Sequence, residues 1–409
     1  MNHFKKQQIQ NIADFNPREQ LAKGVLAKSV PMAMLKEFQR QIMGYEIKAF
    51  NGGAKFRNGD TLLAKITPCL ENGKTAFVDI LDDGDVAFGS TEFIVLRAKN
   101  ETNPEFLYYF SISPDFRKRA IECMEGTSGR QRVNENTLKT LELPIPEPQT
   151  QQSIAAVLSA LDKKISLNKQ INVRLEEMAK TLYDYWFVQF DFLDANGKSY
   201  KSSGGEMVFD ETLKREIPKG WEVKSLWKIA KYFNGLALQK YRPENELDDF
   251  LPVIKIREMN EGVSSNTERA KTNIPKEAII DDGDILFSWS ATLEIKIWSQ
   301  GKGALNQHIF KVTSSEYPKY FFYFELLNYL KHFKMIADLR KTTMGHITQD
   351  HLKQAYICIP SQPLLEKLEK IVTPIFQKIL ITQKQNHQLT QLRDFLLPML
   401  MNGQVSVAE

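Results

Sequence analysis

An internal repeat constrains this chain more than any other sequence feature, because a duplicated order of landmarks indicates the architecture before any single motif is interpreted. NGDTLLAKI at residues 58–66 returns as DGDILFSWS at residues 282–290, and FGSTEFIVL is matched by ALNQHIFKV. An aromatic stretch opened by a proline follows in both copies. A polar glycine loop and a proline then close each copy: Gly129 and Pro146 in the first, Gly345 and Pro360 in the second. Five landmarks in a common order predict two domains with one fold.

Each copy has the same local pattern. Short runs rich in β-branched and aromatic residues, such as Phe93–Leu96 and Ile309–Val312, are separated by Gly and Asp turns, which is typical of strands. A helical stretch and the polar loop follow the strands. We therefore predict an α+β fold for both copies.

A long helical pattern follows each closing proline. Apolar residues recur at steps of three and four, and polar residues interrupt both stripes near the middle: Asn168 and Asn172 in the first, Thr382 and Asn386 in the second. A polar residue in a coiled-coil seam costs stability but specifies register and partner. We predict that the two helices pack on each other through Leu161, Ile165, Asn172, Leu175, Met178, Ile375, Ile379, Asn386, Leu389 and Leu392. The alternative is that each helix only covers its own domain.

The chain length of 409 residues and the hydrophobic content of 42% suit two sizeable domains. The predicted order is a first domain, a central long helix, a linker rich in Gly, Ser and charge, a second domain, a distal long helix and a tail. The corresponding boundaries are 1–146, 147–190, 191–216, 217–360, 361–400 and 401–409. The sequence contains neither a signal peptide nor an apolar run long enough to span a membrane, so we expect a cytoplasmic protein.

Signatures of catalysis are missing from the sequence. It has no phosphate-binding P-loop, no glycine-rich nucleotide fingerprint, no HExxH and no paired cysteines of the CxxC type. We therefore predict neither catalytic residues nor a metal site. One alternative is a self-sufficient Mg-dependent DNA nuclease, because Asp284, Glu294 and Lys296 have the spacing of a metal site with two carboxylates and a lysine. Another is a helical scaffold that binds only protein.

The polar loop tips are the remaining candidates for function. Hydroxyl, amide and basic side chains on a rigid β scaffold suit the reading of base edges and the binding of phosphates. The candidates in the first copy are Lys65, Thr67, Lys74, Ser90, Thr91, Glu92, Gly129, Arg130, Gln131 and Arg132. Those in the second are Ser288, Trp289, Ser290, Asn306, Gln307, His308, Thr343, Gly345 and His346. Side chains at matching places differ, with Glu92 against His308 and Arg130 against His346, so we expect two different ligands.

Several segments together resemble the specificity subunits of type I DNA restriction-modification systems. They are GDTLLAKITPCLENGKTAF, STEFIVL, GTSGRQRV, LPIPEPQTQQSIAAVLSALDKKISLNKQ, LYDYWFVQFDF, GKSYKSSGGEMVF and REIPKGWE. The similarity spans nearly the whole chain and is most specific from the first glycine loop to the Ser-Ser-Gly-Gly linker. It implies an α+β fold with two pseudo-repeated target recognition domains, separated by two long antiparallel helices that form a coiled coil.

The resemblance also implies a function. Each recognition domain would read half of an interrupted, asymmetric sequence in double-stranded DNA, and the chain would dock two adenine-specific methyltransferase subunits and the restriction subunits. The chain itself would be non-catalytic and would bind no cofactor, while its partner subunits would use S-adenosylmethionine, ATP and Mg.

Overall fold

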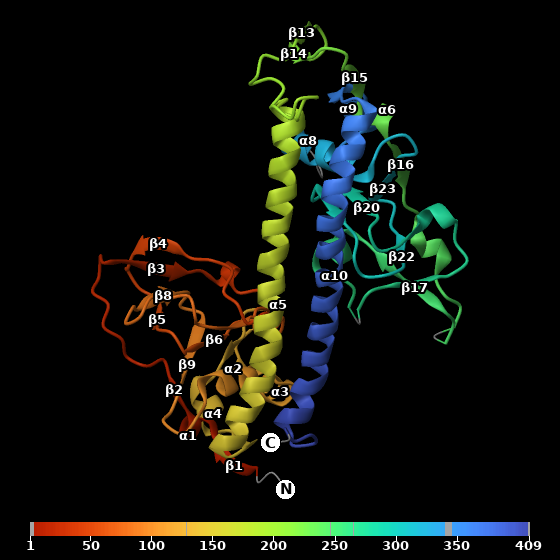
Figure 1. Cartoon of the computed structure of the whole chain (residues 1–409). Coiled ribbons are helices and arrows are strands. Elements are labelled where there is room, and N and C mark those ends of the chain that lie inside the picture. Colours follow the sequence, from red (N-terminus) through yellow and green to blue (C-terminus); the bar gives the residue numbers. More distant parts are fainter. Residues whose placement is uncertain (1–3, 128, 246, 265, 340–345, 408–409) are drawn as a thin grey trace. The chain divides into compact units, whose positions relative to one another are not determined.

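The computed structural model describes residues 4–127, 129–245, 247–264, 266–339 and 346–407 (Figure 1). The chain divides into two compact units, Met1–Ser166 with Gln388–Glu409 as unit 1 and Leu167–His387 as unit 2. Two long helices, α5 (Pro148–Tyr183) and α10 (Gln362–Met401), contribute to both units. None of the described helices combines the length and apolar character that crossing a lipid bilayer requires.

Unit 1 is built on two four-stranded sheets. The first has the order β2-β9-β6-β7 and consists of β2 (Ala13–Phe15), β9 (Phe93–Ala98), β6 (Thr61–Ala64) and β7 (Thr75–Phe77). The second has the order β4-β3-β8-β5 and consists of β4 (Glu46–Ala49), β3 (Leu26–Val30), β8 (Ala87–Gly89) and β5 (Ala54–Phe56). Two short pairs complete the strands: β1 (Lys5–Gln8) with β12 (Glu142–Ile145), and β10 (Met124–Glu125) with β11 (Arg132–Val133).

Unit 2 repeats the two four-stranded sheets with the same order of strands. One sheet has the order β16-β23-β20-β21 and consists of β16 (Lys231–Asn234), β23 (Ile309–Thr313), β20 (Ile285–Ser288) and β21 (Glu294–Ile297). The other has the order β18-β17-β22-β19 and consists of β18 (Arg269–Lys271), β17 (Phe250–Ile254), β22 (Gly303–Leu305) and β19 (Ile279–Ile280). The second sheet of each unit contains one parallel pair, β3 with β8 and β17 with β22. The predicted duplication of an α+β fold is therefore confirmed.

The helices of the two units are similar but do not correspond one to one. Those of unit 1 are α1 (Ile9–Ile12), α2 (Pro104–Ile112), α3 (Pro114–Glu122) and α4 (Glu135–Thr140). Those of unit 2 are α6 (Leu226–Ile229), α7 (Ile256–Glu261), α8 (Lys319–Leu339) and α9 (Gln349–Gln354). The stretch predicted as a linker contains β13 (Met207–Asp210), which pairs with β14 (Arg215–Pro218), and β15 (Glu222–Ser225) then pairs with β24 (Tyr356–Ile359).

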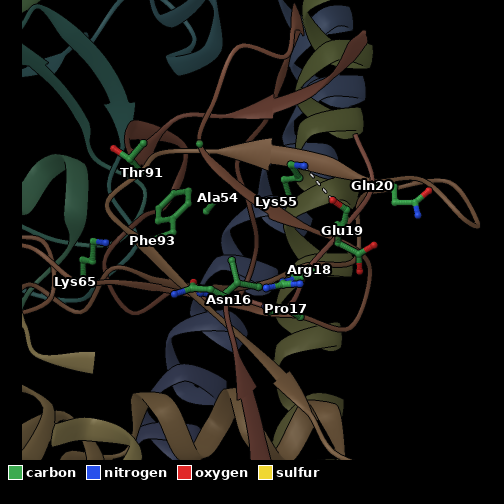
Figure 2. A pocket seen from close by; sticks show the side chains of 12 residues that line it. Asn16, Pro17, Arg18, Glu19, Gln20, Ala54, Lys55, Lys65, Thr91 and Phe93 are labelled. Atoms are coloured by element: carbon green, nitrogen blue, oxygen red, sulfur yellow. Dashed lines mark hydrogen bonds between the residues drawn. The ribbon is translucent and has the colours of Figure 1, made fainter. Parts of the chain in front are cut away.

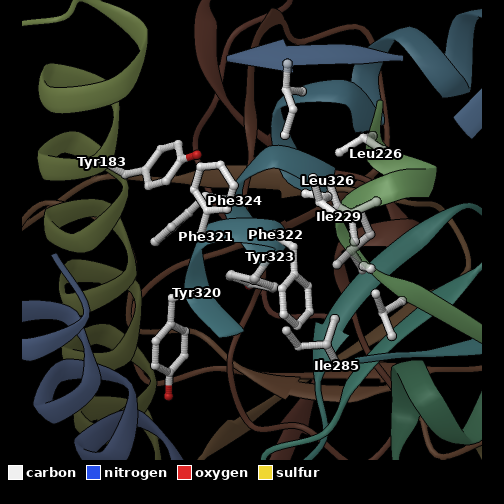
Figure 3. Close-up of a cluster of buried hydrophobic side chains, with 14 of the residues drawn as sticks. Tyr183, Leu226, Ile229, Ile285, Tyr320, Phe321, Phe322, Tyr323, Phe324 and Leu326 are labelled. Atoms are coloured by element: carbon white, nitrogen blue, oxygen red, sulfur yellow. The ribbon is translucent and has the colours of Figure 1, made fainter. Parts of the chain in front are cut away.

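Aromatic side chains form the core of unit 2 (Figure 3). The first turns of α8 carry the run Tyr320–Phe324, in which every side chain is buried because α8 packs between the sheet and the long helices. The ring of Phe324 lies 4.7 Å from that of Tyr183 on α5, and the ring of Tyr320 stacks at 4.3 Å on Phe376 of α10. Such pairs add to the free energy gained by burying their apolar area.

The two long helices pack on each other in an antiparallel arrangement. In unit 2, Asn168 donates from Nδ2 to Asn386 Oδ1 at 2.9 Å. One turn further along α5, Asn172 accepts a hydrogen bond from the hydroxyl of Thr382, one turn earlier on α10. The predicted pairing and its polar centre are confirmed. Because a buried amide without a partner is costly, these bonds favour one register over its neighbours.

The seam of the helix pair departs from the prediction at two positions. Met178 and Leu392 were predicted to face the partner helix, but they are 53% and 45% exposed, respectively. Their neighbours Ala179 and Arg393 are buried instead. A search for large apolar residues misses both, because alanine is small and Arg393 is charged and becomes buried through its ion pair with Asp162.

A buried carboxyl in unit 2 should make stability depend on pH. Glu325 of α8 accepts a hydrogen bond from Tyr183, and burial is the main cause that raises its pKa to about 7, against the opposing influence of Tyr183, Arg215 and Lys180. Its ordinary pKa is 4.5, so between these values the folded chain holds a proton that the unfolded chain releases. The free energy of unfolding should therefore fall as pH rises through this window, by up to about 3 kcal/mol.

Glu325→Gln should remove this dependence, because a neutral amide can still accept the hydrogen bond from Tyr183. The measurement is urea unfolding of wild type, Glu325→Gln and the exposed control Glu177→Gln at pH 5 and pH 8. Equal losses of stability between the two pH values in all three proteins would contradict the prediction.

Candidate functional site

Three polar segments of unit 1 converge at the ends of its strands. The amide of Lys65, just after β6, donates to the carbonyl of Glu92 at 2.9 Å, and the amide of Val133 donates to the carbonyl of Lys65 at 2.9 Å. The amide and hydroxyl of Thr67 both bond to the carbonyl of Gln131. Candidates from three separate stretches of sequence therefore occupy one strand junction.

The remaining unit 1 candidates lie on the same loops. Ser90 Oγ accepts a hydrogen bond from the amide of Glu92, and the carbonyl of Lys74 bonds to the amide of Ala64 at the base of the loop after β6. Gly129 adopts a φ of 82°, a conformation that favours glycine and turns the loop back toward β11. Thr91 is exposed at the tip of its turn.

The two arginines of the glycine loop differ in their surroundings. Arg132 binds the carboxylate of Glu92 through two nitrogens, with Nε to Oε2 at 2.9 Å and Nη2 to Oε1 at 2.7 Å. These bonds from Arg132 lower the pKa of Glu92. The exposed side chain of Arg130 has no ion-pair or hydrogen-bond partner among the residues that the structure describes. Arg132 is therefore held in position, whereas Arg130 can meet a ligand without breaking a contact.

A hollow of about 800 Å³ adjoins this junction in unit 1 (Figure 2). Lys65 and Thr91 line it together with the loop Asn16–Gln20, which carries the exposed side chains of Arg18 and Gln20. Lys55 anchors this loop by donating to the carbonyl of Glu19 at 2.9 Å. This loop was not among the predicted site residues. Its only sequence signal was the Asn16-Pro17 dipeptide, which is typical of turns.

Unit 2 contains the same junction with different side chains. The amide of Trp289 donates to the carbonyl of His308 at 3.3 Å, and the amide of Ile347 donates to the carbonyl of Trp289 at 2.8 Å. Ser290 Oγ lies 3.3 Å from His308 Nδ1, and half-buried Gln307 lies beside the same ring. Thr343 and Gly345, which were also predicted, lie outside the described residues.

For two residues of unit 2, Ser288 and Asn306, the prediction of a ligand contact at the surface is wrong, because both are buried. The side chain of Ser288 is fully buried, and its hydroxyl donates to the carbonyl of Thr292. Asn306 is 6% exposed, and its side chain accepts from the amide of His308. Both residues lie at the end of a strand. Their side chains form hydrogen bonds with backbone groups of the turn that follows.

The structure also corrects one match between the copies. Ile66 bridges to Arg132 in unit 1 as Ser290 bridges to His346 in unit 2. The partner of His346 is therefore Arg132, and the match with Arg130 from the aligned loop glycines was wrong. The error arises because loop length differs between the copies, whereas hydrogen bonding marks equivalent backbone positions.

The residues of the nuclease alternative do not converge. In the register of β20 with β21, Glu294 lies opposite Ser288, whereas Asp284 precedes the other end of the same strand. Asp284 and Ser288 are four residues apart along an extended strand, which corresponds to about 13 Å. Asp284 and Glu294 are therefore too far apart for their carboxylates to bind one ion. Asp284 instead accepts from the amide of Asp281 and pairs with Lys311 at 2.8 Å.

The equivalent aspartate in unit 1 supports this structural role. Asp60 accepts from the amide of Arg57 in the same turn. Glu294 pairs with Lys334 at 3.1 Å. No group of three His, Cys, Asp or Glu side chains suited to a metal ion occurs in the part of the chain that the structure describes.

The type I restriction modification DNA specificity domain matches this chain twice, over residues 25–177 and 218–391. The chain belongs to this family. The MjaIX specificity subunit of Methanocaldococcus jannaschii is 30% identical, over 75% of this chain and 70% of that protein. The HindI specificity subunit of Haemophilus influenzae is 28% identical, over 88% of this chain and 90% of that protein.

The fold of the family is also present. The crystal structure of the type I restriction-modification S subunit from M. genitalium superposes with a TM-score of 0.56 at 17% identity, covering 98% of this chain and 96% of that one. Proteins of this family confer sequence specificity and are not catalytic, in agreement with the prediction that the chain is not an enzyme. Each matched segment contains one of the two strand junctions, so each specificity domain has its own candidate site.

Proposed function

We propose that this chain is the DNA-binding specificity subunit of a type I restriction-modification enzyme. Each unit reads one half of a bipartite, asymmetric target in double-stranded DNA, and its polar junction contacts base edges and phosphates. The observation that carries this proposal is the repetition of one backbone junction with two different sets of polar side chains. A duplicated backbone that carries different polar side chains in its two copies fits two half-sites of different sequence.

The long helices are the proposed docking surface for two adenine-methyltransferase subunits, with which the restriction subunits assemble. Apolar side chains remain exposed on them: Leu167 and Met178 of α5, and Ile371, Ile381, Leu392 and Phe395 of α10. Leu167 and Met178 are close to three helical turns apart and therefore share a face. Exposed apolar residues grouped on helices mark surfaces for protein partners.

The chemistry belongs to the partners in this proposal. This chain binds no cofactor, and the methyltransferase and restriction subunits use S-adenosylmethionine, ATP and Mg. Purified chain incubated with DNA and Mg should therefore leave the DNA intact. Together with methyltransferase subunits, it should direct adenine methylation to one interrupted sequence. Cleavage by the chain alone, or no salt-dependent DNA binding even with methyltransferase subunits present, would refute the proposal.

Arg130→Ala should weaken or relax recognition of the first half-site only. A bidentate contact from arginine to a base contributes about 1 to 3 kcal/mol, and Arg130 has the exposure to make one. Affinity is measured on DNA duplexes that vary one half-site at a time. Arg119→Ala, at an exposed ion pair with Glu122 on α3, serves as the control. An equal loss on every duplex would indicate a phosphate contact in place of base recognition.

A further inference from the structure

Three positions in each unit are equivalent by hydrogen bonding. Residue 65 donates its amide to residue 92 and accepts from residue 133, and residue 289 does the same with residues 308 and 347. The bridges to Arg132 and His346 complete the correspondence. Lys65, Glu92 and Arg132, here called the junction triad of unit 1, therefore match Trp289, His308 and His346, the junction triad of unit 2.

The two triads present different chemistry on this common backbone. In unit 1 the carboxylate of Glu92 holds Arg132, and Lys65 Nζ lies 3.7 Å from Glu135 Oε1. The exposed guanidinium of Arg132 binds Glu92 through Nε and Nη2, so Nη1 retains N–H donors for a further acceptor. The unit 1 triad is a charged group that presents positioned donors.

The unit 2 triad is aromatic. The ring centroids of Trp289 and His308 lie 5.7 Å apart, and Trp289 Nε1 donates to Asn234 Oδ1 at 2.9 Å. This bond fixes the indole of Trp289, whose backbone position is equivalent to that of Lys65, a residue that lines the hollow of unit 1. Rings of this kind make apolar contacts, such as with a thymine methyl group, but cannot make the paired hydrogen bonds by which arginine selects guanine.

We propose that the junction triad is the exchangeable specificity determinant of each unit. This inference rests on the proposed function and adds the residues that distinguish the two half-sites. Because the hydrogen bonding of the backbone is common to both units, we assign the main difference between the half-sites to the side chains at these three positions, and Arg130 adds a separate contact in unit 1. In unit 1, Arg132 contacts a guanine and Glu92 positions its guanidinium. In unit 2, Trp289 and the two histidines exclude that contact.

The main test transfers the unit 2 triad into unit 1. The variant Lys65→Trp/Glu92→His/Arg132→His is prepared as the full chain with methyltransferase subunits, and its methylated sites are mapped across a bacterial genome. The sequence of the first half-site should change, while the second half-site and the spacer stay as in wild type. Retention of the original first half-site by the folded variant would overturn the proposal.

A second variant decides the question if the triple substitution does not fold. Glu92→Gln keeps the shape of the side chain but removes the charge that holds Arg132. It should reduce the preference for guanine at one position of the first half-site about tenfold or more. The matched control is Glu122→Gln, which makes the same change in the exposed pair with Arg119 and should alter neither half-site.

The outcomes separate this inference from the proposed function. Wild-type complexes that methylate DNA without a bipartite preference would refute the proposed function itself. A bipartite preference that Glu92→Gln leaves unchanged would refute only the role of the triad.

Discussion

Arg393→Leu is expected to destabilise unit 1 by about 3 to 5 kcal/mol, because it leaves a buried carboxylate without its counter-ion. The side chains of Arg393 and Asp162 are each 8% exposed and form an ion pair at 2.9 Å. Tyr109 of α2 donates to the other oxygen of Asp162 at 2.7 Å, so the pair joins both long helices to the core of unit 1. Leucine can fill the space but cannot compensate the charge.

This prediction is tested by denaturant unfolding. Unfolding is monitored by circular dichroism, a signal that does not depend on tryptophan fluorescence. The matched control is Arg174→Leu on α5, because the ion pair of Arg174 with Glu177 is exposed and should contribute less than about 1 kcal/mol. The double variant Asp162→Leu/Arg393→Leu should recover much of the loss, since an apolar pair can replace a buried ion pair. The prediction would be contradicted if Arg393→Leu lowered the free energy of unfolding by no more than Arg174→Leu does.

Lengthening both long helices by four residues at the boundary between the units should lengthen the spacer of the DNA target. The insertions follow Ser166 in α5 and His387 in α10, where the chain passes from one unit to the other. Four residues add about 6 Å of helix, which corresponds to one or two base pairs at about 3.4 Å each. The half-site sequences should stay unchanged, because neither strand junction is altered.

Methylation mapping of the lengthened protein with its methyltransferase subunits tests this result. The control carries the insertion in α5 alone, which shifts α5 against α10 in one of the two units. It should abolish activity, because either the Asn168–Asn386 pair of unit 2 or the Asp162–Arg393 pair of unit 1 then loses its register. Altered half-sites at the original spacing would show that the helices do not set the spacer.

Much of the fold was predictable because the sequence contains an internal repeat. The order of turns, strands and glycine loops recurs, and the same strand orders follow in both units. The polar centre of the helix pair was also predictable, because Asn168, Asn172, Thr382 and Asn386 interrupt apolar stripes of regular spacing. The exact seam was not, because alanine gives only a weak apolar signal at position 179 and the burial of Arg393 depends on Asp162, a counter-ion far away in the sequence.

The candidate site was predictable only in part. The sequence identified the loops, but it could not show that the side chains of Ser288 and Asn306 are buried. Serine and asparagine can either be exposed at a loop tip or form hydrogen bonds with the backbone of a turn. It also could not reveal that the loop Asn16–Gln20 borders the same hollow as Thr91, because this contact joins distant parts of the chain.

The sequence by itself determined that this protein is a duplicated α+β chain with two long helices that pair, because periodicity and repetition are local properties of the order of residues. Only the tertiary structure decided which side chains are equivalent and which charges are already satisfied. Arg132 corresponds to His346 and is held by Glu92, while Arg130 is exposed. These facts depend on hydrogen bonds between segments far apart in the chain, whose geometry arises only when the sheets have formed.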